Sequence, residues 1–172
     1  MEFLILSDSH GREDRLLLAL EKQVKRPDAV FFLGDGIRDT EILEGRDLLV
    51  LCVRGNCDWG SYAMNIPDER VYHAEGHTIL LCHGHHYGVK GGMGALLSHA
   101  AQIGADIVLF GHTHLPYEAE IPVGTQIGST ILARPLYLFN PGSAGYDGDG
   151  RGPSFGTLHL QESAVLLSHG RL

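Results

Sequence analysis

Five short apolar runs in this chain each end in side chains with oxygen or nitrogen ligand atoms. The first run, Phe3-Leu4-Ile5-Leu6, leads into Asp8-Ser9-His10, so a carboxylate and an imidazole lie two positions apart where the run stops. The other four runs end in Gly34-Asp35, Gly55-Asn56-Cys57-Asp58, His83-Gly84-His85 and Gly111-His112-Thr113-His114. A single Asp-x-His tripeptide is common in ordinary turns, but five such endings need a common structural cause.

The order of elements in the first third supplies that cause. Apolar residues at helical spacing predict a helix over Arg12 to Lys25, which Pro27 stops, and a short helix over roughly Asp39 to Glu44. The continuous apolar runs Ala29 to Leu33 and Leu48 to Val53 are typical of buried strands. This alternation indicates an α/β fold, in which ligands bind outside the carboxyl ends of parallel strands. We therefore expect Asp8, Asp35 and Asn56 at one sheet edge.

The middle third continues the pattern less regularly. We predict a strand over Thr78 to Cys82, a helix over Met93 to Ile103 with Gly104 as its C-cap, and a strand over Asp106 to Phe110. Trp59 to Glu75 is predicted to be a loop with one short strand. Gly88 to Gly94 is glycine-rich, and a flexible linker is slightly favoured there over a loop that closes on a substrate.

The last third changes character, because no long helix is evident in it. Four strands are predicted there, and we expect them to pair antiparallel and complete a second sheet: Tyr117 to Ile121, Ile131 to Phe139, Gly156 to Leu160 and Ala164 to Ser168. Asn140-Pro141-Gly142-Ser143 has the composition of a turn. Tyr146 to Pro153 is rich in Gly and Asp and is expected to be an exposed loop.

Length and charge limit the class of protein. The 172 residues are expected to form one domain, 1–172, and the net charge of −8 comes without a run of Lys or Arg. This argues against a general nucleic-acid binder, but not against a nucleotide-like substrate, because bound metals add positive charge locally.

Three cysteines without paired spacing indicate a reducing compartment. No apolar run approaches the ~20 residues of a membrane helix, so we expect a cytoplasmic protein without a membrane partner.

Histidine is unusually frequent, with eleven in the chain, and several cluster at the ends of apolar runs. The candidate metal ligands are Asp8, His10, Asp35, Asn56, His83, His112 and His114. Four imidazoles, two carboxylates and one amide exceed what one tetrahedral zinc ion takes, and they suit two ions with a bridging carboxylate. Mixed nitrogen and oxygen ligands without thiolate fit Mn²⁺, Fe, Ni²⁺ or Zn²⁺, and Mn²⁺ is our first choice. Such a pair can ionise a bridging water at neutral pH and bind a phosphoryl group.

The ordered motifs Asp-x-His, Gly-Asp, Gly-Asn-x-Asp, His-Gly-His and Gly-His-x-His resemble those of the calcineurin-like metallophosphoesterases. With the compact length and Asn-Pro-Gly-Ser, the chain is most similar to the small bacterial and archaeal phosphodiesterases of that superfamily. The motifs span Asp8 to Ser143. The resemblance implies a four-layer αββα sandwich of two mixed sheets. It also implies a first metal on Asp8, His10 and His114, a second on Asn56, His83 and His112, Asp35 as the bridge, and in-line attack by a bridging hydroxide.

One position departs from the family. Many relatives have His where this chain has Cys57, and the resemblance implies that this His protonates the leaving group or holds the phosphate. A thiol of pKa ~8.5 is a poor general acid in its place. Loss of a general acid typically costs ~10²–10⁴ in rate, least for good leaving groups, so we expect a preference for aryl phosphodiesters. The alternative is that Cys57 merely fills space near the site.

Several residues near the candidate ligands each have more than one expected role. We expect Asp58 either to hold Asn56 or a site histidine, or to act as a helix N-cap. His85 could contact the phosphate, whereas His86 is expected to be peripheral. Asn140 to Ser143 either packs beside the ligands or forms a plain turn.

These observations favour a hydrolase acting on phosphoric ester bonds, a metal-dependent phosphodiesterase with a small phosphate-ester substrate. A phosphomonoesterase or nucleotidase would use the same metals. The runner-up from another class is a non-catalytic protein-binding scaffold of the same fold, like the retromer subunit that resembles this family. The sequence is compatible with a dimer or tetramer but demands neither.

Overall fold

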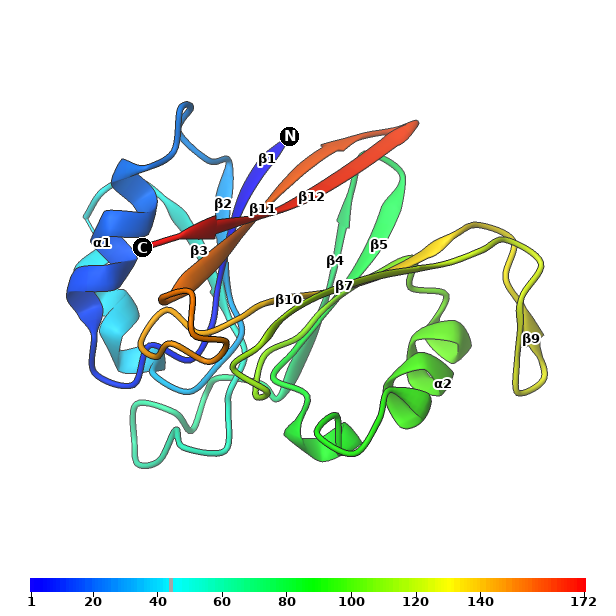
Figure 1. Ribbon diagram of the computed structural model, residues 1–172, viewed down its shortest axis with the longest axis horizontal. Helices are drawn as coiled ribbons and strands as arrows, with labels where there is room; N and C mark the ends of the chain where they lie inside the picture. Colours follow the sequence, from blue (N-terminus) through cyan, green and yellow to red (C-terminus); the bar gives the residue numbers. More distant parts are fainter. Residues whose placement is uncertain (44) are drawn as a thin grey trace.

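Two five-stranded sheets form the body of the computed structural model, which describes residues 1–43 and 45–172 (Figure 1). The first sheet consists, in spatial order, of β12 (Ala164–Arg171), β11 (Ser154–Gln161), β1 (Glu2–Leu6), β2 (Ala29–Phe32) and β3 (Leu49–Cys52). The second consists of β4 (Glu69–Ala74), β5 (His77–Cys82), β6 (Ile107–Leu109), β10 (Leu136–Pro141) and β7 (Pro116–Ile121). A separate ribbon of β8 (Gln126–Ile127) and β9 (Thr130–Ile131) extends from one end of the molecule (Figure 1).

Each sheet is mixed. β1, β2 and β3 are parallel in the first sheet, as are β5, β6 and β10 in the second, while β11, β12, β4 and β7 pair antiparallel. The parallel strands therefore direct their carboxyl ends toward the same side of their own sheet. At that side the loop after β1 is bonded to the loop after β2, because Asp8 N donates to Gly34 O at 2.9 Å. Gly111 N donates to His83 O at 3.1 Å and so joins the loops after β6 and β5.

The sheets pack face to face, with helices outside them. α1 (Glu13–Glu21) and the 3₁₀ helix η1 (Ile37–Leu43) lie on the side of the first sheet, and α2 (Gly94–Ile103) lies on the side of the second (Figure 1). Large apolar side chains from both sheets, among them Phe3, Phe31 and Leu109, fill the space between. The predicted αββα sandwich of two mixed sheets is therefore confirmed. No helix among the described residues has the length and apolar character needed to cross a membrane.

Most predicted elements are present with adjusted ends. The first helix is shorter than Arg12 to Lys25, and Val24 beyond it is fully exposed. The predicted helix at Asp39 to Glu44 is the 3₁₀ helix η1, and Glu44 lies outside the described residues. Gly104 caps α2 with φ 72°, as predicted. The short strand expected between Trp59 and Glu75 is β4.

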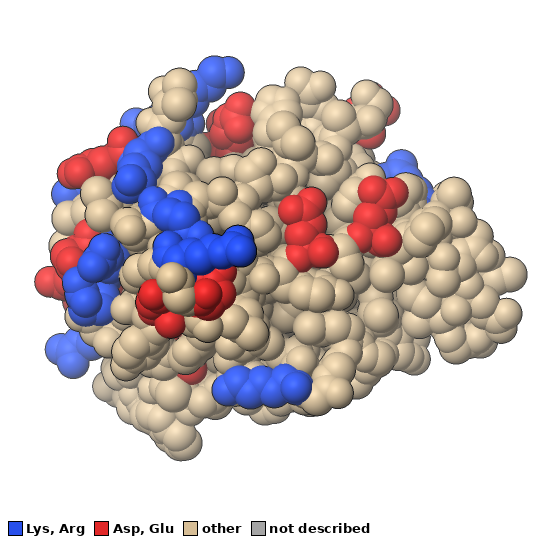
Figure 2. Space-filling view, in the orientation of Figure 1, with Lys and Arg blue, Asp and Glu red and all other residues tan. Residues whose placement is uncertain are grey.

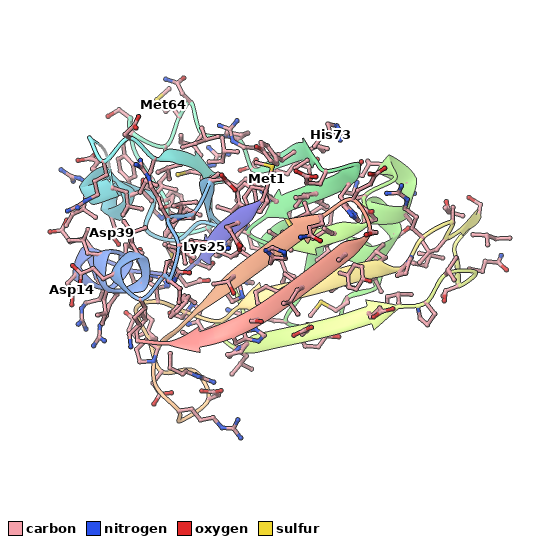
Figure 3. The ribbon with its side chains drawn as sticks, turned by 90° about the horizontal axis from the view of Figure 1, so that it is seen from above. Met1, Asp14, Lys25, Asp39, Met64 and His73 are labelled. Atoms are coloured by element: carbon pink, nitrogen blue, oxygen red, sulfur yellow. The ribbon has the colours of Figure 1, made fainter. Side chains whose placement is uncertain are left out.

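The prediction for the last third was wrong in one respect. Only β7 and β10 belong to the second sheet, whereas β11 pairs antiparallel with β1 and extends the first sheet together with β12. The reason is that β11 places Leu158 and Leu160 in the core between the sheets, beside the apolar face of β1. The two strands form a long hairpin, which lies across the molecule in Figure 3.

Two strand boundaries near proline also differ from the prediction. The predicted strand Ile131 to Phe139 is divided in the structure: Ile131 ends β9, β10 begins at Leu136, and Pro135 lies between them. Proline lacks the N–H that a continuous strand would donate. The supposed turn Asn140 to Ser143 begins instead in a strand, because β10 runs through Pro141 and Gly142 follows with φ 82°.

Charges on the surface are mixed in sign. Figure 2 shows Lys and Arg side chains interspersed with Asp and Glu over the part of the molecule near α1, and fewer charges over the opposite part. Met64 lies at the tip of a projecting segment between β3 and β4, with 76% of its surface exposed (Figure 3).

Candidate metal centre

The loops that follow β1, β2 and β6 adopt an unusual backbone conformation. Among the described residues, seven that are not glycine have positive φ, and five of these are Asp8, His10, Asp35, His112 and His114. A left-handed backbone costs about 1 kcal/mol or more per residue and persists only where surrounding contacts enforce it. These five residues are all predicted metal ligands, so the strained turns coincide with the candidate centre.

Three ligand atoms form a first group. His114 Nε2 lies 3.1 Å from Asp8 Oδ1, and His10 Nε2 lies 3.3 Å from His114 Nε2 and 3.8 Å from Asp8 Oδ1. The opposite oxygen of Asp8 is held in place, because Oδ2 accepts hydrogen bonds from Ser7 Oγ at 2.5 Å and His112 N at 3.1 Å. The group of Asp8, His10 and His114 can hold a metal ion.

A second group combines Asp35, His83 and His112. His83 Nδ1 lies 2.7 Å from the carbonyl oxygen of Leu33, to which it donates, so in the neutral ring Nε2 carries the free lone pair. That Nε2 lies 3.3 Å from Asp35 Oδ2. The rings of His83 and His112 pack edge to face, with centroids 5.1 Å apart.

The two groups adjoin, and Asp35 lies between them. Its Oδ2 is 3.9 Å from His10 Nε2 in the first group, while Asp8 Oδ1 is 3.9 Å from His83 Nε2 in the second. Asp35 Oδ1 accepts a hydrogen bond from Cys57 N at 2.7 Å. The two candidate ligand groups therefore lie side by side, with Asp35 near both.

Electrostatics hold Asp35 charged and His112 neutral, which are the states that bind a cation, whereas they favour the protonated form of His83. Burial alone would raise the pKa of Asp35, but the imidazole of His83 and the N–H of Cys57 outweigh it and hold that pKa well below its usual range. Burial lowers the pKa of His112 to about 4, with help from the neighbouring charges of His83 and Lys90. Burial opposes protonation of His83 as well, but the carboxylates of Asp35 and Asp8 raise its pKa overall.

Two buried atoms in the centre have no hydrogen-bond partner among the described residues, namely Asp8 Oδ1 and His83 Nε2. Both residues have no exposed surface. Leaving a buried polar atom unsatisfied costs about 1–3 kcal/mol. A cation at each group would accept one of these lone pairs, so the residues present fit the metal ions that the sequence predicts.

The carboxylate of Asp58 is hydrogen-bonded to the backbone of two loops that carry candidate ligands. It accepts four backbone N–H groups, from Asp35 at 2.8 Å, Gly36 at 2.9 Å, Ile37 at 3.1 Å and Gly55 at 2.8 Å. It therefore ties the loop after β2 to the loop after β3. Among the described residues, Asp58 has no hydrogen bond to Asn56 or to a histidine. The predicted N-cap role was wrong, because in the described part of the chain no helix begins directly after Asp58; its carboxylate instead accepts the N–H groups of Gly36 and Ile37 at the start of η1 from a separate loop.

Glycine is required where these loops approach each other. A Cβ on Gly55 would lie 2.1 Å from Asp35 Oδ1 and 2.5 Å from Asp35 N. A Cβ on Gly111 would lie 2.0 Å from Ser7 Oγ. Such distances are impossible for real atoms, so the glycines of these two motifs serve the close packing of the candidate ligands.

Comparison with known proteins decides the family. The family model described as the calcineurin-like phosphoesterase superfamily domain matches residues 1–163. The chain belongs to the calcineurin-like phosphoesterases. It is 32% identical to the probable metallophosphoesterase YsnB of Bacillus subtilis over 97% of this chain and 89% of that protein. It is 31% identical to the phosphodiesterase YfcE of Escherichia coli over 68% of this chain and 56% of that one.

A solved structure shares the fold. Vps29 of Entamoeba histolytica in complex with Zn²⁺ superimposes with a TM-score of 0.71 over 99% of this chain and 98% of that one, at 24% identity. Family membership and the clustered ligand types together make this a metallophosphoesterase with residue groups suited to metal ions.

Asn56 is the predicted ligand with the least support from geometry in this calcineurin-like phosphoesterase. It is exposed, and its Nδ2 donates to Cys57 Sγ at 3.3 Å. Within the described residues it has no hydrogen bond to the other six candidates. Its role as a ligand therefore stays a prediction.

Cys57 lies at the junction of the two groups. Its Sγ falls within 4.8 Å of ligand atoms of His10 and Asp35. Desolvation and the carboxylate of Asp35 raise the pKa of the thiol to about 11. Without a metal, Cys57 is therefore a neutral thiol at neutral pH. Its effect on leaving groups stays a prediction.

The Asn-Pro-Gly-Ser segment packs against the ligand loops, which was one of its two predicted roles. Asn140 Nδ2 donates to Gly111 O at 2.7 Å and to Thr113 Oγ1 at 3.0 Å. Ser143 Oγ donates to Asp8 O at 2.7 Å. The segment thus fixes the loop that carries His112 and His114 against the loop that carries Asp8.

His85 lies beside the second group, and His86 lies farther out. The ring of His85 is 5.4 Å from that of His83 and 6.1 Å from that of His112. Burial and the nearby His86 lower the pKa of His85, so it is neutral at pH 7. His86 is exposed, and its Nε2 lies 3.6 Å from Asp68 Oδ2, in agreement with a peripheral position.

Sequence reasoning missed Tyr146. The Gly- and Asp-rich segment from Tyr146 to Pro153 is an exposed loop, as predicted. However, the ring of Tyr146 packs on the rings of His10 and His114. The available signal was an isolated aromatic residue within a glycine-rich loop, directly after a motif that contacts the ligands.

Proposed function

We propose that this protein is a metal-dependent phosphodiesterase that hydrolyses small phosphate esters with the help of two divalent ions. The observation that carries the proposal is the pair of buried, unpartnered atoms Asp8 Oδ1 and His83 Nε2, 3.9 Å apart at the meeting of two ligand groups. Two buried ligand atoms of this kind, one in each group, are suited to bind cations. Membership in the phosphoesterase superfamily supports the same conclusion.

The ligand assignment follows the two groups. The first ion would be held by Asp8, His10 and His114, and the second by Asn56, His83 and His112, with Asp35 as the bridge. The distances among Asp8, His10 and His114 and those among Asp35, His83 and His112 support this division, and the position of Asp35 near both groups supports its bridging role. Asn56 is assigned from the family resemblance alone.

When bound, the two ions would supply Lewis acidity toward a phosphate ester and would lower the pKa of a bound water. The chain contributes orientation and charge. Leu33 O fixes the ring of His83, and Asp58 fixes the backbone of Asp35. Neutral His85 at the edge of the second group is suited to a hydrogen bond with a phosphate oxygen.

The donor set bears on the choice of metal. Mixed imidazole, carboxylate and amide ligands suit Mn²⁺, Fe, Ni²⁺ and Zn²⁺. We propose Mn²⁺ as the native ion because the centre contains oxygen ligands from two carboxylates and an amide. The similar Vps29 of Entamoeba histolytica was solved in complex with Zn²⁺, which makes zinc the first competitor in a metal comparison.

A protein-binding scaffold is the second candidate, favoured by the likeness to Vps29. The presence of every predicted ligand type counts against it, because a scaffold has no need to retain buried, unpartnered ligand atoms. A phosphomonoesterase or nucleotidase differs from the leading proposal only in its substrate, and the similarity to the phosphodiesterase YfcE supports a diester.

The test is metal analysis followed by hydrolysis assays. Purified protein is loaded with Mn²⁺ and assayed on bis(p-nitrophenyl) phosphate and on p-nitrophenyl phosphate. We expect two ions per chain and faster turnover of the diester. Faster turnover of the monoester would replace the phosphodiesterase by a phosphomonoesterase. A metal-loaded protein that hydrolyses neither would favour the scaffold.

A further inference from the structure

Tyr146 is an aromatic residue outside the predicted ligand set that lies directly on part of it. Its ring centroid is 5.0 Å from that of His10 and 5.7 Å from that of His114, with the Tyr146 and His114 planes only 20° apart. About half of its surface, 53%, is exposed. Both imidazoles belong to the first ligand group, so the contact concerns one half of the centre.

These two imidazoles lack the usual restraint on a metal ligand. A metal-binding histidine normally donates its second ring N–H to an oxygen, which fixes the orientation of the ring. His83 meets this rule through Leu33 O. For His10 and His114, the side-chain hydrogen bonding within the described residues consists of the contact between their own Nε2 atoms. Their Nε2 atoms also lie near the carboxylates of Asp8 and Asp35, which leaves the packing of another ring as the restraint on the outer part of each imidazole.

The loop that carries Tyr146 is fastened to the first ligand loop. Tyr146 N and Gly145 N donate to Ser143 Oγ at 2.9 and 3.2 Å, and that hydroxyl donates to Asp8 O at 2.7 Å. Gly145 N also donates to Asp8 O at 3.1 Å. The backbone of Tyr146 and the backbone of Asp8 therefore cannot move independently.

The far side of the loop is fastened as well. Gly148 lies so close to His114 that a Cβ there would be 2.0 Å from the His114 carbonyl oxygen. The guanidinium of Arg171 donates to both oxygens of Asp149, at 2.9 and 2.6 Å, and to Gly152 O at 2.7 Å. Anchored on both sides, the loop holds the ring of Tyr146 over the two imidazoles.

We propose that Tyr146 is a positioning residue for the first metal. Its ring holds the imidazoles of His10 and His114 with their Nε2 atoms beside Asp8, and so increases the affinity of the first ion. This inference rests on the proposed function, because it requires that these two histidines bind a metal ion. Loss of the aromatic contacts predicts about two- to tenfold weaker binding of that ion, with the second ion unaffected.

The test is calorimetric titration of the metal-free protein with Mn²⁺. The variants are Tyr146→Ala, Tyr146→Phe and the control Tyr117→Ala, and His10→Ala identifies the binding step of the first ion. Tyr117 is similarly exposed, at 39%, but its ring packs on Phe110, 6.1 Å away. We expect two binding steps in the wild type, a first-ion step weakened two- to tenfold in Tyr146→Ala, and steps like those of the wild type in Tyr146→Phe and Tyr117→Ala.

A second readout needs no metal. In NMR spectra of the metal-free protein, the ring resonances of His10 and His114 should shift in Tyr146→Ala, because the ring current of Tyr146 is lost, while those of His83 stay in place. Unchanged resonances and unchanged first-ion affinity in Tyr146→Ala would overturn the inference, as would equal weakening of both ions or a Tyr146→Phe variant as weak as Tyr146→Ala. A wild-type protein that binds no ion contradicts the proposed function itself, and this inference with it.

Discussion

At the scale of single residues, the centre combines strain with unsatisfied ligand atoms. Asp8 and His10 have φ of 55° and 47°, and the Asp8 carboxylate uses only one of its oxygens in hydrogen bonds. The chemistry of these residues was predictable from the sequence, because strand ends deliver polar side chains to one edge. The contact of Tyr146 was not, because it depends on how a loop without regular structure is anchored.

Loss of a first-group ligand should abolish activity without unfolding the protein. Asp8→Asn retains the size of the side chain but removes its negative charge, and His10→Ala removes a partly exposed ring. We expect turnover of bis(p-nitrophenyl) phosphate to fall by at least ~10²-fold in both, with the melting temperature largely retained, since neither change opens the core between the sheets. Retained turnover in both variants would exclude these ligands from the centre. His73→Ala, on the exposed face of β4, is the matched control.

The thiol of Cys57 should react slowly despite its exposure. Its pKa of about 11 lies above the ordinary value, so the reactive thiolate is fully available only above that pH. In metal-free protein, alkylation of Cys57 by iodoacetamide should be slower at pH 8 than that of free cysteine and should rise toward pH 11. Mass spectrometry of the labelled peptide follows the rate. Alkylation at pH 8 as fast as that of free cysteine would contradict the raised pKa.

Replacement of Cys57 by histidine tests the expected substrate preference. A histidine there would supply a general acid, which helps most with poor leaving groups. We expect Cys57→His to raise kcat on alkyl phosphodiesters and on monoesters relative to aryl diesters, by up to ~10²-fold. Assay of the three substrates with both proteins gives the ratio. No relative gain would favour the view that Cys57 only fills space.

At the scale of elements, the sequence predicted the positions of the strands well and their pairing within the sheets less well. Continuous apolar runs mark β1, β2 and β3, and their order predicted the parallel half of the first sheet. The pairing of β11 with β1 joins residues about as far apart in sequence as the chain allows, so no local pattern could reveal it. The same holds for Asp58, whose hydrogen bonds reach across two loops.

Removal of the Asp58 carboxylate should therefore destabilise two elements at once. Asp58→Ala would leave four backbone N–H groups without their acceptor, some of them buried. At about 1–3 kcal/mol per unsatisfied buried group, we expect the free energy of unfolding to fall by about 3 kcal/mol or more. Urea denaturation measures the change. Asp68→Ala, which removes an exposed ion pair with Arg54, should change it by less than about 1 kcal/mol. Equal effects would contradict this role of Asp58.

At the scale of the whole molecule, a buried histidine links the two sheets at the end opposite the candidate centre. His77, at the start of β5 in the second sheet, contacts Asp106 Oδ2 through Nδ1 at 2.7 Å. Its Nε2 lies 3.2 Å from Gln161 O, at the turn of the β11–β12 hairpin in the first sheet. The candidate centre thus lies at one end, while this buried imidazole joins the sheets at the other.

His77→Ala should weaken the fold and spare the metal centre. The change removes the contacts of the buried imidazole with Asp106 Oδ2 and Gln161 O, so we expect about 1–3 kcal/mol of destabilisation and a melting temperature lowered by several degrees. His73→Ala, on the exposed face of the same sheet, should stay within about 0.5 kcal/mol. Calorimetry compares the melting temperatures, and Mn²⁺ titration checks that metal binding is unchanged. A His77→Ala protein as stable as His73→Ala would show that the link between sheets is weak.

The central claim is that two cations share Asp35 at the meeting of the two ligand groups. Anomalous X-ray diffraction from crystals of the protein loaded with Mn²⁺ tests it most directly. We predict two anomalous peaks, one among Asp8, His10 and His114 and one among His83, His112 and Asn56, with the carboxylate of Asp35 in contact with both. A single peak, peaks away from these residues, or no peak in a fully loaded protein would contradict the claim.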